Sequence, residues 1–258
     1  MNNIKIKDMS NKYYIRTIGA NQDALVKCIK KAIELAEKDS ETKRIVFYSY
    51  TKNNFDLVSK VLGVKDINKM FSSPLKFNGI SVPLFCATKK TYTSGLNDIV
   101  ICCHMDSADV FVADDKPFAK YIIGLSWTQN GLDEWIERWN AENLDTDDLH
   151  QATISTIEPL AKIALEEMDD RMFNTKCMGN SSDEETCKTY IRAINKYLPS
   201  LTPKDIQNYL VTELSWTNEN AQKVGDLLDR LKNGKTFKGG KKVGLKTYYT
   251  QWKKNKNK

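Results

Sequence analysis

Three residues directly behind one apolar run could carry out acid–base or nucleophilic chemistry. His104, Asp106 and Ser107 follow the run Asp98–Cys103 (DIVICC). A histidine beside a carboxylate can act as a general base that the carboxylate orients, and a nearby serine can serve as nucleophile or anion ligand. If the strand extends this far, His104 and Asp106 point to the same side. We name these three as candidate catalytic residues, although the same segment equally fits the cap of a helix.

The same region offers carboxylates for a metal ion. Asp106, Asp109, Asp114 and Asp115 could in principle hold Mg²⁺ together with substrate phosphates, but their spacing matches no metal loop, and a solvated acidic loop is the simpler interpretation. The adjacent Cys102, Cys103 and His104 would point in alternating directions along a strand, which disfavours a shared zinc ion. The six cysteines include no CxxC pair. We therefore expect no metal site, leave the cofactor unknown, and expect mostly buried free thiols.

Two further strand-like runs end in residues that suit a ligand. The run Arg44–Tyr50 (RIVFYSY) is followed by the triplet Thr51, Lys52 and Asn53, which leads into a predicted helix. A lysine beside a helix N-terminus suits a phosphate or carboxylate, whereas the alternative is an ordinary solvated turn.

The second run, Lys120–Leu125 (KYIIGL), is followed by Ser126, Trp127 and Thr128. A tryptophan flanked by hydroxyl groups can be a platform for a base or another flat ligand. The alternative is that Trp127 packs in the core, as Trp135 and Trp139 would at helical spacing.

The elements that must position these residues alternate between strands and helices over residues 1–141. An amphipathic helix is predicted at 21–38, and strands at 44–50, 80–88, 98–103 and 120–125, with further helices after 53 and at 130–139. Pro83 places the strand 80–88 at a sheet edge, because proline donates no ladder hydrogen bond. This order predicts a Rossmann-like α/β domain with a mostly parallel sheet, without the usual glycine fingerprint. Ligands of such sheets bind beyond the carboxyl ends of the strands.

A polar, acidic stretch from Glu142 to Thr156 is expected to be a linker. Behind it only helical periodicity remains, with helices predicted at 157–168, 183–198, 203–213 and 217–231. We therefore expect a small all-α domain over 156–233. The last two helices have the spacing of a helix-turn-helix, but the acidic residues of the second favour an ordinary hairpin.

Residues 234–258 are expected to form a basic, aromatic tail. From Arg230 to Lys258 there are eleven basic residues and no acidic one, so the 39 basic and 33 acidic residues of the whole chain leave 28 against 33 in the first 229. Lysines interleaved with aromatic rings are typical of sequence-indifferent nucleic-acid binding. The candidate contact residues are Lys238, Lys241, Lys242, Lys246, Tyr248, Trp252, Lys253 and Lys254. The tail could instead dock on this protein's own acidic body or on an acidic protein partner.

Two functional hypotheses remain open. The first is a cytoplasmic binding or sensing protein, not bound to a membrane, that holds a phosphorylated or nucleotide-like ligand in the α/β domain. Its helical domain and tail would contact a partner or nucleic acid without sequence specificity. The second is a small hydrolase or transferase that acts on a nucleotide-type substrate through His104 and Asp106. The sequence does not decide whether the protein is an enzyme.

Overall fold

All described strands pair in parallel within one sheet. The computed structural model describes residues 11–128, 130–145, 157–172 and 180–256. The strands are β1 (Lys12–Arg16), β2 (Arg44–Ser49), β3 (Leu84–Thr88), β4 (Asp98–Cys103), β5 (Ala119–Ser126) and β6 (Glu142–Asn143). Their order is β3-β2-β4-β5-β1-β6. The chain divides into two compact units, Met1–Ala152 and Thr153–Lys258, and the sheet belongs to the first.

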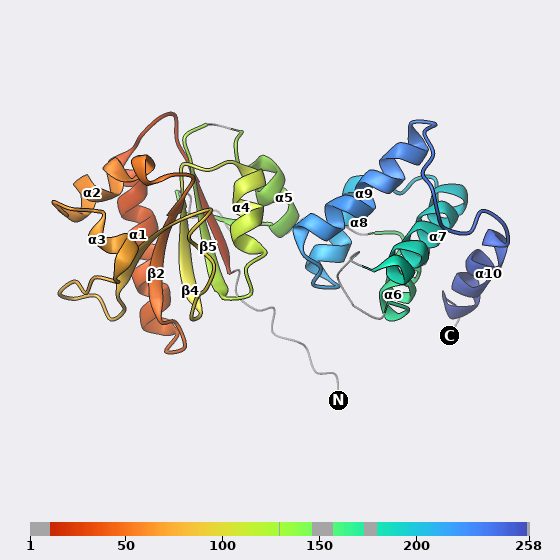
Figure 1. Cartoon of the computed structure of the whole chain (residues 1–258), viewed down its shortest axis with the longest axis horizontal. Coiled ribbons are helices and arrows are strands. Elements are labelled where there is room, and N and C mark those ends of the chain that lie inside the picture. The colour runs from red at the N-terminus through yellow and green to blue at the C-terminus, as the bar shows by residue number, and fades with distance from the viewer. Residues whose placement is uncertain (1–10, 129, 146–156, 173–179, 257–258) are drawn as a thin grey trace. The chain divides into compact units, whose positions relative to one another are not determined.

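Helices cover both faces of the sheet, as Figure 1 shows. One face packs against α1 (Gln22–Lys38), the 3₁₀ turn η1 (Lys52–Phe55), α2 (Asp56–Leu62) and α3 (Lys69–Ser72), and the other against α4 (Ser107–Asp114) and α5 (Asp133–Trp139). Burial on both faces explains the continuous apolar runs of the central strands, because neither face meets water. All six residues of β4 are buried. The predicted Rossmann-like α/β architecture is confirmed.

Two strands were not expected from the sequence. In β1, charged residues at both ends enclose only three apolar residues, and Lys12 is nonetheless buried because its ammonium group pairs with the Asp114 carboxylate. In β6, Glu142 and Asn143 pair with β1 at residues expected to begin the linker. Residues 146–156 of that expected linker lie outside the described residues.

The edge strand β3 begins later than predicted. It starts at Leu84, directly after Pro83, whose carbonyl accepts a hydrogen bond from the Ile45 amide. The predicted edge position is confirmed, since β3 is the first strand of the sheet. On its outer side Leu84 forms an antiparallel bridge with Leu75, through two hydrogen bonds of 2.8 Å.

The second unit consists of helices in its described part. They are α6 (Pro159–Asp170), α7 (Ser181–Tyr197), α8 (Pro203–Thr212), α9 (Asn218–Lys232) and α10 (Leu245–Lys256). Thr202 caps α8 in a capping box with Asp205, and Pro203 follows at the first helical position, as its sequence indicated. The predicted all-α character is confirmed.

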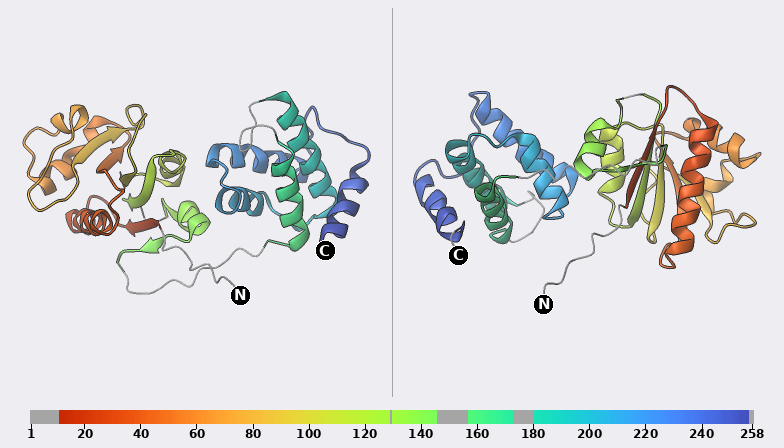
Figure 2. Two further views of the ribbon diagram at one scale, coloured as in Figure 1. Left: turned by 90° about the horizontal axis from the view of Figure 1, so that it is seen from below. Right: turned by 180° about the vertical axis from the view of Figure 1, so that it is seen from behind.

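The described part of the segment 234–258 packs on the helical unit, in line with the alternative that this basic segment docks on the protein itself. Its residues 245–256 form α10, and both views of Figure 2 show this last helix alongside α6 and α7. Trp252 on α10 is fully buried, and Phe237 before it is buried as well. The apolar spacing of Leu245, Tyr248, Tyr249 and Trp252 is that of an amphipathic helix, which the many lysines obscured.

Candidate ligand site at the carboxyl ends of the strands

The sheet has a topological switch point between β2 and β4. From β2 the chain continues outward to β3, whereas from β4 it continues in the opposite direction to β5. The loops that leave these neighbouring strands therefore diverge at their carboxyl ends, and ligands of open α/β sheets bind at such a point. A hydrogen bond of 3.0 Å from the Ser49 hydroxyl to the Cys103 carbonyl joins the last residues of the two strands.

His104 directly follows β4 and has a strained backbone. Its φ of 62° lies in the left-handed region, which costs a residue with a side chain about 1 kcal/mol or more. Both ring nitrogens are buried and have no hydrogen-bond partner among the described residues. Burial alone lowers the pKa of His104 from 6.5 to about 4, so the imidazole is neutral at physiological pH. Strain and unsatisfied polar atoms at one residue are typical of a functional position.

Trp127 stacks on His104. The two ring centroids lie 3.7 Å apart with an interplanar angle of 32°, and Trp127 is 38% exposed. Trp127 therefore does not pack in the core, and the alternative raised by the sequence applies to Trp135, which is fully buried. Ser126, the neighbour of Trp127, is buried, and its hydroxyl accepts a hydrogen bond of 3.1 Å from the Thr128 amide. This hydrogen bond holds the turn that carries Trp127.

Asp106 and Ser107 have structural partners that differ from those of a catalytic dyad. Asp106 is the N-cap of α4 and accepts a hydrogen bond of 3.3 Å from the Asp109 amide. The Ser107 hydroxyl donates to the Gly131 carbonyl (3.1 Å) and accepts from the Trp135 amide (3.2 Å). Since neither nitrogen of His104 is bonded, the expected pairing of His104 with Asp106 and Ser107 is absent from the described structure.

A second polar group lies at this edge; the sequence indicated its Asp109 only as a possible metal ligand and did not indicate its partner Lys89. Asp109 on α4 has a side chain only 3% exposed and pairs with the Lys89 ammonium at 3.3 Å, directly after β3. Lys89 also lies 5.8 Å from the ring centroid of Tyr50, which follows β2. The Asp109 carboxylate beside the Tyr50 hydroxyl raises the pKa of Tyr50 to about 12. The signal available in the sequence was that a parallel strand at 84–88 must end at the same edge.

The carboxylates of this group are close enough to affect each other. Burial, followed by a hydrogen bond with Asp109, raises the pKa of Asp106. The second carboxylate oxygen of Asp109 and the hydroxyl of Tyr48 are both buried without a partner among the described residues. With two carboxylates at the start of α4, this part of the edge suits hydroxyl and amino donors better than it suits phosphate.

The triplet after β2 does not join the other candidates. Lys52 begins η1, and its ammonium group lies 5.1 Å from the ring centroid of Phe71 on α3. The Thr51 hydroxyl lies 3.2 Å from the Asn54 side-chain oxygen, and Asn53 is exposed. Among the contacts of the described residues, His104 and Trp127 meet each other, whereas the ring contact of Lys52 is with Phe71. The chain enters a short 3₁₀ turn after Thr51, which directs Lys52 towards α3.

Exposed apolar side chains mark the same edge. Among the described residues of the first unit, the large exposed apolar side chains are Ile18, Tyr50, Leu96 and Trp127. Three of them follow β1, β2 and β5, and only Leu96 precedes a strand. Exposed apolar groups around a few polar ones are typical of a binding surface. The loop after β1 lies at the same edge, because the Gly19 amide donates a hydrogen bond of 2.9 Å to the Trp127 carbonyl.

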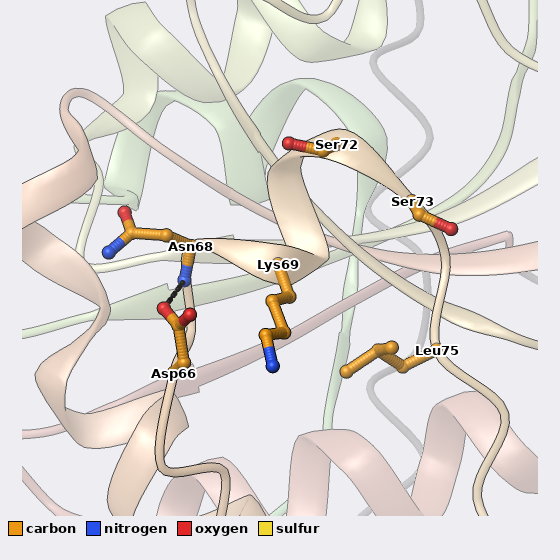
Figure 3. A pocket seen from close by; sticks show the side chains of 6 residues that line it. All are labelled: Asp66, Asn68, Lys69, Ser72, Ser73 and Leu75. Carbon is orange, nitrogen blue, oxygen red and sulfur yellow. Dashed lines mark hydrogen bonds between the residues drawn. The ribbon is translucent and has the colours of Figure 1, made fainter.

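An open hollow of about 450 Å³ lies elsewhere, beside α3 (Figure 3). It is lined by Asp66, Asn68, Lys69, Ser72, Ser73 and Leu75. In Figure 3 the Lys69 side chain extends between Asp66 and Leu75, and the Asn68 amide donates to the Asp66 carboxylate (3.1 Å). No residue of the hollow follows a strand end, and all but Leu75 are exposed. We therefore place the candidate site at the carboxyl edge.

The predicted contact residues of the second unit fall into two groups. Exposed lysines make up the first, namely Lys238, Lys241, Lys242, Lys246, Lys253 and Lys254. The rings of Tyr248 and Trp252 make up the second, and they pack against Tyr190 with centroid distances of 5.1 and 6.1 Å. The lysines are available to a partner, whereas the two rings are occupied within the helical unit.

Two properties complete the description of the residues that the structure covers. In this part of the chain no group of three or more His, Cys, Asp or Glu side chains is arranged to hold a metal ion. Nor does any described helix have the length and apolar character needed to cross a membrane.

The fold and the edge residues define a Rossmann-like α/β unit with a candidate ligand site, followed in the chain by a helical unit. Residues 157–253 match a family described as a domain of unknown function (DUF1889). No curated protein and no solved structure matches the chain. The matched range includes most of α10, so this similarity supports treating the segment 234–253 as part of the helical unit.

Proposed function

We propose that the α/β unit is a binding or sensing module for a small, ring-containing ligand of the nucleotide type. The observation that carries this proposal is His104, with its left-handed backbone and two buried, unbonded nitrogens beneath the half-exposed ring of Trp127. A flat ligand would stack against Trp127, which contributes about 1–3 kcal/mol for a base on an aromatic ring. Hydroxyl groups of its sugar would find an acceptor in the exposed carboxylate of Asp106.

Binding is favoured over catalysis by the partners of the edge residues. A hydrolase or transferase acting through His104 and Asp106 needs the two side chains within hydrogen-bond reach, and His104 has no such partner in the described structure. The Ser107 hydroxyl is held between α4 and α5 by two backbone groups. The five described cysteines are buried free thiols, which agrees with the proposed cytoplasmic location.

The test uses the full chain and a panel of adenosine, AMP, guanosine and GMP. Binding is followed by thermal shift and tryptophan fluorescence, because a ligand that binds the folded state raises the melting temperature. Replacing Trp127 by Ala should weaken binding about tenfold or more, given the size of one stacking interaction.

The matched control is Leu96→Ala, which removes another exposed apolar side chain at the opposite edge of the sheet. It should leave ligand affinity unchanged. Absence of binding by every member of the panel, or equal affinities for wild type and Trp127→Ala, would overturn the proposal.

A second candidate function concerns the helical unit, for which we propose contact with nucleic acid through its exposed lysines. In the described part of this unit, no basic residue from Arg230 onward forms an ion pair with a carboxylate. Unpaired ammonium groups attract phosphates without reading sequence. Retention of the full chain by a duplex at low but not high salt supports this contact, and no retention at low salt contradicts it.

A further inference from the structure

The aromatic residues of 237–252 are used within the helical unit. Phe237 is buried, and the Arg192 guanidinium lies 4.1 Å from its ring centroid. Tyr249 stacks on Tyr197 of α7, with centroids 4.8 Å apart and an interplanar angle of 7°. With Trp252 fully buried as well, these rings are not free to stack on unpaired bases.

The backbone that presents the first lysines is tightly held against α7. Arg192 donates to the carbonyls of Phe237 (2.6 Å) and Gly239 (3.0 Å). The Gly240 amide donates to Glu185 (2.7 Å), and the Lys241 amide donates to the Thr189 hydroxyl (2.9 Å). A methyl group at Gly240 would lie 2.7 Å from the Lys188 Cβ, which shows how closely the two segments approach. The lysines at 238, 241 and 242 therefore project from a fixed backbone.

The helix α10 adds further exposed lysines to this unit. Lys246 and Lys253 are seven residues apart, so they lie on the same side of the helix about 10 Å apart. Lys253 lies 4.5 Å from the Tyr249 ring centroid, and Lys196 on α7 lies 5.4 Å from that of Tyr197. The stacked tyrosines thus have an ammonium group beside each ring, and Lys196 adds to the surface a residue that the sequence analysis did not name. We call Lys196, Lys238, Lys241, Lys242, Lys246 and Lys253 the lysine face.

We propose that the lysine face binds the phosphate backbone of double-stranded nucleic acid without contact to the bases, an inference that rests on the proposed nucleic-acid contact of this unit. Lys246 and Lys253, about 10 Å apart along α10, match a duplex, which presents roughly six phosphates along that length against roughly three for one strand. An anionic membrane fits less well, because Val243 is the only large exposed apolar side chain among the described residues of this unit.

The experiment measures binding of the full chain to three probes by fluorescence anisotropy. The probes are a short duplex, one of its strands, and an abasic strand with the same number of phosphates. The duplex should bind more tightly than the strand, and removing the bases should leave the strand's affinity unchanged. Raising salt from about 50 to about 200 mM should weaken all three.

Paired variants assign the binding to the lysine face. Lys246→Gln/Lys253→Gln should weaken duplex binding severalfold and reduce the slope of log affinity against log salt by roughly two. The control Lys162→Gln/Lys223→Gln removes the same charge from two exposed lysines on α6 and α9 and should leave both quantities unchanged.

Each contrary result has a distinct meaning. Tighter binding to the strand than to the duplex, with loss of affinity on removing the bases, would overturn the duplex proposal while leaving nucleic-acid contact intact. Binding to phosphatidylserine vesicles but to none of the three probes would replace nucleic acid by a membrane. Failure of all probes at low salt would reject the nucleic-acid contact itself.

Discussion

At the scale of single residues, His104 links the candidate site to stability. Its pKa is about 4 in the folded chain, whereas exposure on unfolding restores the ordinary value near 6.5. Between these values the unfolded state binds more protons than the folded state, so stability falls as the pH falls through this window. The expected loss is about 1–2 kcal/mol, less than the full shift implies, because the side chain is not completely removed from water.

The measurement is urea unfolding of wild type and His104→Asn at pH 7 and about pH 5. Asparagine tolerates a left-handed backbone and does not titrate here, so the variant isolates the imidazole. Wild type should lose roughly 1 kcal/mol more than the variant on acidification. Equal losses would show that His104 keeps an ordinary pKa.

A variant at Ser107 tests whether its hydroxyl has a structural role or acts as a nucleophile. Ser107→Ala leaves the buried Trp135 amide without its acceptor, which should destabilise the α/β unit by about 1–3 kcal/mol. We expect a lower urea midpoint and faster hydrogen exchange at the start of α5, with unchanged affinity for any nucleotide that binds. Unaltered stability together with lost turnover of a nucleotide would instead favour the hydrolase or transferase alternative.

At the scale of elements, the contact between the segment before α10 and α7 can be tested with two glycines. Gly240 and Gly244 have φ of 69° and 72°, so alanine at either position is strained by about 1–2 kcal/mol. At Gly240 the new methyl group would also lie 2.8 Å from the Lys188 carbonyl carbon, whereas at Gly244 nothing lies within 4 Å.

Gly240→Ala should therefore cost roughly 1–3 kcal/mol more than Gly244→Ala. Hydrogen exchange of the α7 and α10 amides measures the difference, and we expect faster exchange in the Gly240 variant. The same exchange rates in both variants would mean that the segment is not held closely against α7.

Several elements could be predicted from the sequence because their pattern is local. DIVICC and KYIIGL each begin with a charged residue and continue as an apolar run. Such runs are typical of strands buried on both faces, and both lie in the sheet. The strand β1 escaped detection because the partner of Lys12 is Asp114, about a hundred residues away. The helix α10 was not predicted because its lysines suggested a basic tail, while its buried ring positions depend on α6 and α7.

Part of the candidate site could also be predicted from the sequence. Parallel strands place their carboxyl ends together, so His104 and Trp127 could be assigned to one edge, and they stack there. The direction of Lys52 depends on the 3₁₀ turn after β2, which the sequence did not reveal. Lys89 pairs with Asp109, which follows it in the chain only after β4, and no short sequence motif indicates such a pair.

At the scale of the whole molecule, the two proposed sites use separate residues in separate units. We therefore expect Trp127→Ala to leave duplex affinity unchanged and Lys246→Gln/Lys253→Gln to leave nucleotide affinity unchanged. Calorimetric titration of each variant with each ligand measures both values. Reciprocal changes of equal size would instead demonstrate energetic coupling between the units.

The bridge between Leu75 and Leu84 has a consequence for self-association. A sheet that ends in a long bare strand offers its unpaired amide and carbonyl groups to other chains, which is a common route to aggregation. Here one border is occupied at its start by the chain's own Leu75, and the opposite border is the two-residue strand β6. Among the described residues, only the last four residues of β3 are left as an unpaired border of any length, so we expect little strand pairing with a second copy.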